Sequence, residues 1–283
     1  MRHWRGSALN GTGSPRDTGR GMNGFFLRGW TRFAQDPELL HWLGSAIPAA
    51  RAAVADPANA HWLRCQGSWF AGVNVLANDT DGAVAGSGPL RGAAVDFLRT
   101  ALGLTSIAWD RGQISVAYPG YPRQSADESD AAFRYRLNRD SAHLDGLLPV
   151  GPNRRRMLRE PHGFVLGLPM SDADAGASPM VVWEGSHEVM RAALHTALAA
   201  QDPETWADVD VTGAYHAARR EVFATCRRVV VHARPGQAYL VHRLALHGVS
   251  PWVKGAKAPP EGRMIAYFRP VLPGPIGNWL TEP

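Results

Sequence analysis

The second half of the sequence consists largely of short runs of β-branched, aromatic and aliphatic residues that are separated by glycine and proline. Runs of about four to eight such residues between turn-forming residues are typical of antiparallel strands. The runs cover residues 113–118, 143–148, 163–169, 179–183, 227–232, 237–242 and 263–269. Because so many short strands bury their apolar faces best against one another, the pattern favours a sandwich or barrel of antiparallel sheets.

Helical patterns lie mainly before this region. Asp36-Pro37-Glu38 is expected to begin a helix, because aspartate caps helix N-termini and proline suits the first helical position. The predicted helices cover residues 25–55, 89–102, about 186–194 and about 213–225. Residues 123–140 are polar and charged, so we expect a loop or the entrance of a lid there. The predicted fold class is therefore mainly β with flanking helices.

The predicted organisation is one domain over residues 22–283, with a helical part at about 22–110 and a strand-rich core at about 111–270. No internal repeat or low-complexity linker divides this region. Residues 1–21 are rich in Gly, Ser and Arg and lack the apolar centre of a secretory signal. We expect them to be a disordered arm, or to precede a natural start at Met22.

Composition argues against several classes of function. The two cysteines, Cys65 and Cys226, are isolated, which disfavours a disulfide scaffold or zinc ribbon and favours a reducing, cytoplasmic location. No apolar run of about 18 residues is present, so no membrane span is expected. The formal charge of +5 comes partly from arginines near the N-terminus, so it does not indicate a nucleic-acid partner. Nothing in the sequence indicates an oligomeric state.

His143-Leu144-Asp145 is the first candidate functional motif. In a strand, side chains two residues apart project from the same face, so this imidazole and carboxylate can reach one point. With a distant second histidine they would form a 2-His-1-carboxylate facial triad, which binds Fe(II) and leaves coordination positions open. Taken alone, the tripeptide is better explained as a strand-end aspartate beside a hydrogen-bonded histidine.

His247 is the strongest candidate for the second histidine. It follows an apolar strand and precedes Gly248, which permits close backbone approach. His242 is the local alternative, but it lies within the strand, where a packed, hydrogen-bonded histidine is more common. Arg263 opens the next apolar strand and is suited to bind a carboxylate through two hydrogen bonds. A surface arginine at a strand end is an equal alternative.

Four features occur together in the order His143-Leu144-Asp145, then residues 179–187 ending in Gly-Ser-His, then His247-Gly248, then Arg263. On these features the sequence resembles the phytanoyl-CoA dioxygenase-like family of Fe(II)- and 2-oxoglutarate-dependent oxygenases. The resemblance spans residues 113–270, somewhat over half of the chain. It implies a double-stranded β-helix (jelly roll, cupin-like), iron ligands His143, Asp145 and His247, and Arg263 on the C5 carboxylate of 2-oxoglutarate.

The sequence departs from the family pattern at three places. Glu184 stands where the family usually has proline, and an inserted loop lengthens the interval between His247 and Arg263. The family often supplies a lysine to 2-oxoglutarate from the strand before the triad. Here Tyr118 lies near that point, so its hydroxyl is the expected replacement, and Ser250 is a further candidate contact.

The resemblance implies a dioxygenase that uses molecular oxygen to hydroxylate a small organic substrate, with conversion of 2-oxoglutarate to succinate. Related halogenases replace the carboxylate ligand, so Asp145 favours hydroxylation. Arg134 and Arg136, with Trp183, are candidate substrate contacts and are compatible with an anionic substrate. A solvated loop with internal ion pairs is the simpler explanation of these arginines. The alternative function is a cupin-like non-oxidative metalloenzyme or metal-binding protein on the same ligands, which has no need of Arg263.

Overall fold

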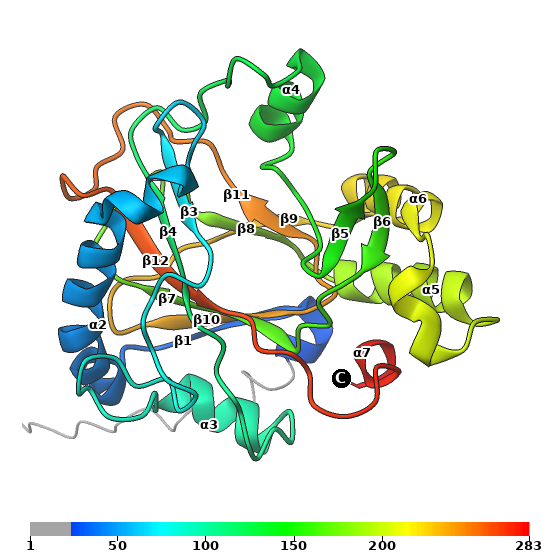
Figure 1. Ribbon diagram of the computed structural model, residues 1–283, viewed down its shortest axis with the longest axis horizontal. Helices are drawn as coiled ribbons and strands as arrows, with labels where there is room; N and C mark the ends of the chain where they lie inside the picture. The colour runs from blue at the N-terminus through cyan, green and yellow to red at the C-terminus, as the bar shows by residue number, and fades with distance from the viewer. Residues whose placement is uncertain (1–23, 283) are drawn as a thin grey trace, which may run out of the picture.

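Two antiparallel sheets form the centre of the computed structural model, which describes residues 24–282 (Figure 1). The large sheet has the order β1-β10-β7-β12-β4-β3-β2, and the small sheet has the order β11-β8-β9. The strands of the large sheet are β1 (Trp30–Phe33), β2 (Leu63–Arg64), β3 (Trp69–Gly72), β4 (Gln113–Ala117), β7 (Phe164–Pro169), β10 (Ala238–His242) and β12 (Arg263–Phe268). Those of the small sheet are β8 (Met180–Trp183), β9 (Arg228–Val231) and β11 (His247–Val249). A separate hairpin consists of β5 (Leu147–Val150) and β6 (Arg155–Leu158).

The strand order is that of a jelly roll. An isolated bridge pairs His143 with His247, so the segment around His143 extends the small sheet beyond β11. Along the chain, β4, this segment, β7, β8, β9, β10, β11 and β12 correspond to the eight jelly-roll strands. One sheet then pairs the sixth, third, eighth and first strands, and the other pairs the second, seventh, fourth and fifth. The predicted fold class is confirmed.

Helices cover the outer faces of both sheets (Figure 1). The helices α2 (Pro37–Ala55) and α3 (Ala93–Thr100) pack on the large sheet, whose outward side chains include Val116 and Phe268. The helices α5 (Ser186–Leu198) and α6 (Thr212–Thr225) pack with outward side chains of the small sheet, including Trp183. A third cluster, with Val182, Tyr239 and Tyr267, lies between the sheets.

Helix α2 begins where the sequence predicts. Asp36 caps it, because its Oδ1 accepts from the backbone N–H of Glu38 at 2.9 Å. The other carboxylate oxygen, Oδ2, accepts from the backbone N–H of Ala93 at 2.6 Å, at the start of α3. One side chain therefore stabilises the N-termini of both helices on this face.

Two predictions about secondary structure are wrong. Residues 25–35 are not one helix, because only 24–28 are helical and Trp30–Phe33 then pairs with β10 as an edge strand. Residues 123–140 are not only a loop, since they contain α4 (Asp130–Asn138), which Ser129 caps through the N–H of Ala132. The short elements η1 (Pro57–Trp62), η2 (Pro203–Asp208) and α7 (Asn278–Thr281) were also not predicted.

The predicted arm over residues 1–21 lies outside the described residues. Within residues 24–282, no helix has the length and apolar character needed to cross a membrane.

Asp36→Ala is expected to lower the free energy of unfolding by about 1–2 kcal/mol, because it removes the side-chain cap of two helices at once. Asp56→Ala is the matched control, because the carboxylate of Asp56 accepts from Ala58 at the start of the short helix η1 and caps no second helix among residues 24–282. Urea unfolding of both variants measures the difference. Equal losses would contradict the double role of Asp36.

Candidate metal centre

His143, Asp145 and His247 meet at one point. Each offers one ligand atom, and these atoms all lie within 4.8 Å of one another. His143 Nε2 is 3.2 Å from Asp145 Oδ1, and His247 Nε2 is 3.6 Å from Asp145 Oδ2. In the part of the chain that the structure describes, no other group of three His, Cys, Asp or Glu side chains has this arrangement.

Backbone carbonyls orient both imidazoles. His143 Nδ1 lies 2.9 Å from the carbonyl oxygen of Ser141, and His247 Nδ1 lies 2.9 Å from that of Ala245. A carbonyl can only accept, so Nδ1 carries the proton in each ring and donates it. Nε2 is therefore the nitrogen of each ring that is left for a metal ion, and in both rings it faces Asp145.

The backbone joins the two histidines directly. The N–H of His143 donates to the carbonyl of His247 at 2.8 Å, and the N–H of His247 donates back at 3.1 Å. Gly248 allows this approach, because a Cβ at that position would overlap the carbonyl of Asp140. The close backbone approach predicted for this glycine is thus made to the segment that carries His143 and Asp145.

Asp140 and Ser141 adopt an uncommon backbone conformation just before His143, with φ of 53° at each residue. For a residue other than glycine, the left-handed region costs about 1 kcal/mol or more. Arg228 of β9 stabilises the segment, since its Nε and Nη2 donate to the two carboxylate oxygens of Asp140 at 2.7 Å each. The N–H of Val249 also donates to the carbonyl of Asp140 at 2.9 Å.

Asp145 is ionised in this arrangement. Burial alone would raise the pKa of its carboxyl group, but the charge of Arg269 and the contacts with His247 and His143 hold that pKa well below its usual value. Arg269 Nη1 lies 3.5 Å from Asp145 Oδ2. Two imidazole nitrogens and one carboxylate oxygen that face a common point fit Fe(II) or a similar divalent transition metal.

Arg263 lies at the other end of β12 from Arg269. It is 5% exposed, pairs with Ala117 of β4, and lines a small hollow together with Tyr239. Its Nη1 is buried and has no hydrogen-bond partner among residues 24–282. Tyr239 and Tyr267, whose hydroxyls are 2.9 Å apart, lie inside the barrel beside it. Sequence reasoning missed both tyrosines, although their place in the strand alternation marks them as inward-facing.

Three other predicted site residues make contacts with residues other than His143, Asp145 and His247. Tyr118 packs against the core between the large sheet and its helices. Ser250 accepts from Arg228 Nη2 at 3.3 Å, and Trp183 packs edge-to-face on Phe223 at 5.3 Å in the outer core of the small sheet.

The predicted substrate contacts on α4 have different environments. Arg136 forms an ion pair with Glu128 at 2.8 Å, whereas Arg134 is exposed. His242, the alternative distal ligand, is buried elsewhere, where its Nδ1 accepts from the N–H of Leu244 and its Nε2 lies 3.1 Å from Arg191 Nη2.

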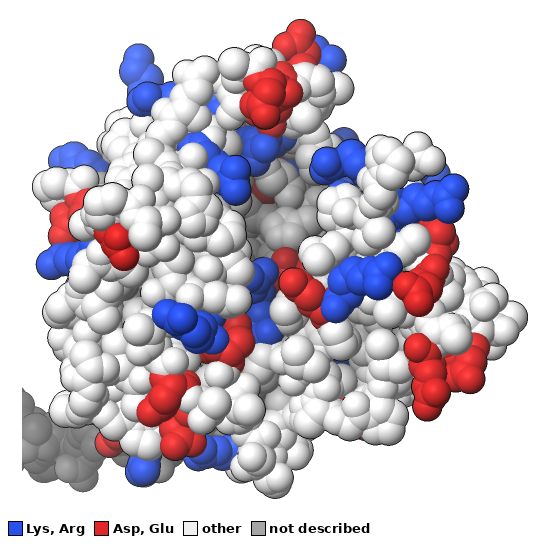
Figure 2. All heavy atoms as spheres, in the orientation of Figure 1, with Lys and Arg blue, Asp and Glu red and all other residues white. Residues whose placement is uncertain are grey.

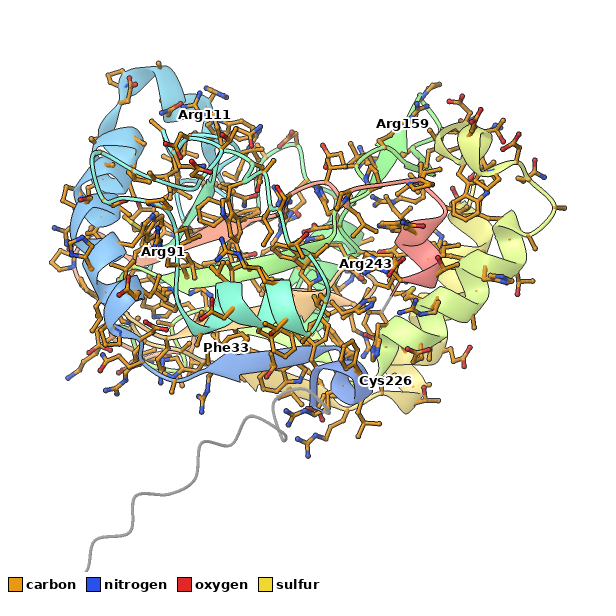
Figure 3. All side chains as sticks on the ribbon, turned by 90° about the horizontal axis from the view of Figure 1, so that it is seen from below. Phe33, Arg91, Arg111, Arg159, Cys226 and Arg243 are labelled. Carbon is orange, nitrogen blue, oxygen red and sulfur yellow. The ribbon has the colours of Figure 1, made fainter. Side chains whose placement is uncertain are left out.

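Figure 2 shows that the molecule is hollowed between the side that carries β3 and β4 and the β5–β6 hairpin. The chain from α4 to β5, which includes His143 and Asp145, runs past this hollow (Figures 1 and 2). Figure 3 labels Arg111 and Arg159 on the two sides of the opening. Several rim arginines are paired with acids, for example Arg159 with Asp208 at 3.1 Å. The side chain of His143 is 47% exposed, so this side of the candidate site is open to solvent.

No family model matches the sequence, and no curated protein matches it. Among solved structures, the chain is similar to the non-heme alpha ketoglutarate dependent carbocyclase SnoK from nogalamycin biosynthesis, with 10% identity over 91% of this chain and 87% of that chain and a TM-score of 0.48. It is similar to AviO1 from Streptomyces viridochromogenes Tue57, with 13% identity over 93% and 100% and a TM-score of 0.45. EctD from S. alaskensis with bound Fe shows 14% identity over 94% and 83% and a TM-score of 0.43.

Alanine in place of His143, Asp145 or His247 is expected to abolish binding of Fe(II), because each substitution leaves only two protein ligands. His242→Ala is the control and should retain binding in the folded fraction. Anaerobic calorimetric titration with Fe(II) measures both. Equal loss of binding in His242→Ala would mean that the distal ligand is wrongly assigned.

Arg228→Met is expected to weaken metal binding about 10–100-fold, because Asp140 would no longer fix the backbone ahead of His143. The free energy of unfolding should fall by about 1–3 kcal/mol, since a buried carboxylate loses its two donors. Arg227→Met is the matched control, because Arg227 is 76% exposed and pairs with Glu184 instead. Unchanged metal affinity in Arg228→Met would exclude this positioning role.

Proposed function

We propose that this protein is an Fe(II)- and 2-oxoglutarate-dependent oxygenase. The observation that carries the proposal is the convergence of two imidazole Nε2 atoms and one carboxylate on a single point of a jelly roll. Such a set occupies one face of an octahedral ion and leaves three adjacent positions for co-substrate and oxygen. The resemblance of the motifs to the phytanoyl-CoA dioxygenase-like family supports the same assignment.

His143, Asp145 and His247 would hold the iron. When bound, Fe(II) supplies the activation of molecular oxygen that is coupled to oxidative decarboxylation of 2-oxoglutarate to succinate. The protein's own contribution is to orient the three ligands and to exclude water. Apolar side chains between the sheets, among them Val182 and Val241, are fully buried and line the interior behind the site. Such an environment protects reactive species from side reactions.

Arg263 is the proposed receptor for the distal carboxylate of 2-oxoglutarate. A buried guanidinium with an unpaired N–H is unfavourable, and a carboxylate would satisfy it through two charge-assisted hydrogen bonds. Burial raises the pKa of the Tyr239 hydroxyl well above the usual value and keeps it protonated, and this hydroxyl donates to that of Tyr267 at 2.9 Å, so the hydroxyl of Tyr267 would add the neutral donor. This arrangement favours 2-oxoglutarate chemistry over a non-oxidative metalloenzyme, which has no use for a buried arginine at this position.

The proposed reaction is hydroxylation of a small organic molecule that enters through the hollow beside α4 and the β5–β6 hairpin. Asp145 supports hydroxylation over halogenation, since it fills the position that related halogenases leave to a halide. Arg134 on α4 is exposed and is a candidate contact for an anionic group of the substrate.

The test is an anaerobic titration of the Fe(II)-loaded protein with 2-oxoglutarate, observed as the visible charge-transfer band of the chelate. The band should appear and saturate in the wild-type protein. In Arg263→Gln the affinity for 2-oxoglutarate should fall about 10–100-fold, the equivalent of one or two charge-assisted hydrogen bonds, while Fe(II) affinity stays unchanged.

Arg234→Gln is the control for loss of a positive charge, because Arg234 is 67% exposed and pairs with Asp172. Iron binding without the band would refute the oxygenase proposal and favour the non-oxidative metalloenzyme. An unchanged 2-oxoglutarate affinity in Arg263→Gln would refute only the role of that arginine.

A further inference from the structure

Arg269 places a second positive charge inside the barrel, directly at the metal centre. It follows β12 and continues the inward alternation of Arg263, Ile265 and Tyr267. Its side chain is 18% exposed, and its Nη1 lies 3.5 Å from Asp145 Oδ2. The two arginines therefore stand at opposite ends of the inward face of β12, Arg269 beside Asp145 and Arg263 beside Tyr239.

The guanidinium of Arg269 is only partly satisfied by the described residues. Its Nη2 donates to Gln113 Oε1 at 2.7 Å, but its Nε is buried and has no hydrogen-bond partner among residues 24–282. Asp110 is the other acid at this point, and one of its carboxylate oxygens is already used by the backbone N–H of Arg269 at 2.9 Å.

The distance between Arg269 and Asp145 is longer than in a hydrogen-bonded ion pair. Charge-assisted N–H···O bonds are about 2.7–2.9 Å long. Arg228 reaches Asp140 at 2.7 Å through two nitrogens, whereas Arg269 reaches Asp145 through one nitrogen at 3.5 Å. Arg269 therefore retains donor capacity toward a further acceptor at the site.

Charge balance points to the nature of that acceptor. A divalent metal held by the triad would take an oxygen of Asp145, which is also the closest carboxylate to Arg269. The metal and Arg269 would then carry three positive charges against the two carboxylates of Asp145 and Asp110, and this excess in a poorly solvated site is unfavourable unless another anion enters. A carboxylate beside Asp145 would supply that charge and would accept from the unpaired donor of Arg269.

We propose that Arg269 is a second carboxylate receptor, which binds the carboxylate adjacent to the 2-oxo group of the co-substrate while Arg263 binds the distal one. This inference rests on the proposed function. It assigns the two ends of a dicarboxylate to two arginines of one strand, so the strand itself sets the length of the acid that fits. Arg269 then acts on any 2-oxo acid, whereas Arg263 acts only on those with a second carboxylate.

The experiment uses the full chain loaded with saturating Mn(II), and isothermal titration calorimetry with 2-oxoglutarate and with 2-oxobutyrate, which lacks the distal carboxylate. In Arg269→Gln both acids should bind at least 10-fold more weakly than in the wild type. In Arg263→Gln only 2-oxoglutarate should lose affinity. Arg269→Lys, which keeps the charge but not the planar fork, should lie between the wild type and Arg269→Gln.

Metal titration of the same variants separates a receptor from a residue that merely positions Asp145. As a receptor, Arg269 can be replaced by Gln with unchanged or tighter Mn(II) binding, because a neighbouring cation is removed. Weaker Mn(II) binding together with wild-type 2-oxoglutarate affinity at saturating metal would overturn the inference. So would a loss confined to 2-oxoglutarate, because Arg269 would then act on the distal carboxylate.

Failure of the proposed function gives a different result. In that case the metal-loaded wild-type protein binds neither acid. If the wild type binds 2-oxoglutarate and Arg269→Gln binds it equally well, only the assignment of Arg269 is overturned.

Discussion

The reciprocal backbone hydrogen bonds between His143 and His247 are the interaction on which the site depends. They add the segment around His143 to the small sheet and so complete the jelly-roll order of strands. The same two bonds set the separation of the two imidazoles, whose ring centroids are 4.7 Å apart. The contact that completes the strand order therefore also brings the candidate ligands His143 and His247 together, and the glycine that follows His247 makes it possible.

The charged residues near this contact differ in how completely other residues pair with them. Outside the barrel, Asp140 is fully engaged by Arg228, which rigidifies the backbone ahead of the ligands. At the mouth, Asp145 is held ionised but is only loosely contacted by Arg269. At the other end of β12, Nη1 of Arg263 is buried and has no hydrogen-bond partner among the described residues 24–282. Fully paired charged groups stabilise the fold, whereas a charged group with an unused hydrogen-bond donor can still bind a ligand.

Strand β12 shows how one element serves stability and chemistry at once. Met264, Ala266 and Phe268 pack outward beneath the helices, and the alternate residues face the interior. The same alternation accounts for Tyr118. Tyr118 directly follows β4 and points outward, so its ring packs in the core between the large sheet and its helices, although the neighbouring Ala117 pairs with Arg263. A shift of one residue along a strand moves a side chain to the other face of the sheet. The sequence does not fix the end of a strand to within one residue, so the face of Tyr118 could not be predicted.

Local signals in the sequence determined most of the strands, the helix start at Asp36, the shared direction of His143 and Asp145, and the need for glycine at position 248. These depend on residues a few positions apart, where backbone periodicity decides the geometry. Only the tertiary structure decided that His247 lies with His143 and Asp145 while His242 packs elsewhere, that Arg228 holds Asp140, and that Arg269 approaches Asp145. The residues of each pair lie far apart in the sequence, and the order of the strands in the sheets brings them within reach of each other's side chains. Such contacts leave no periodic trace in the chain, because each partner alone resembles an ordinary strand-end residue.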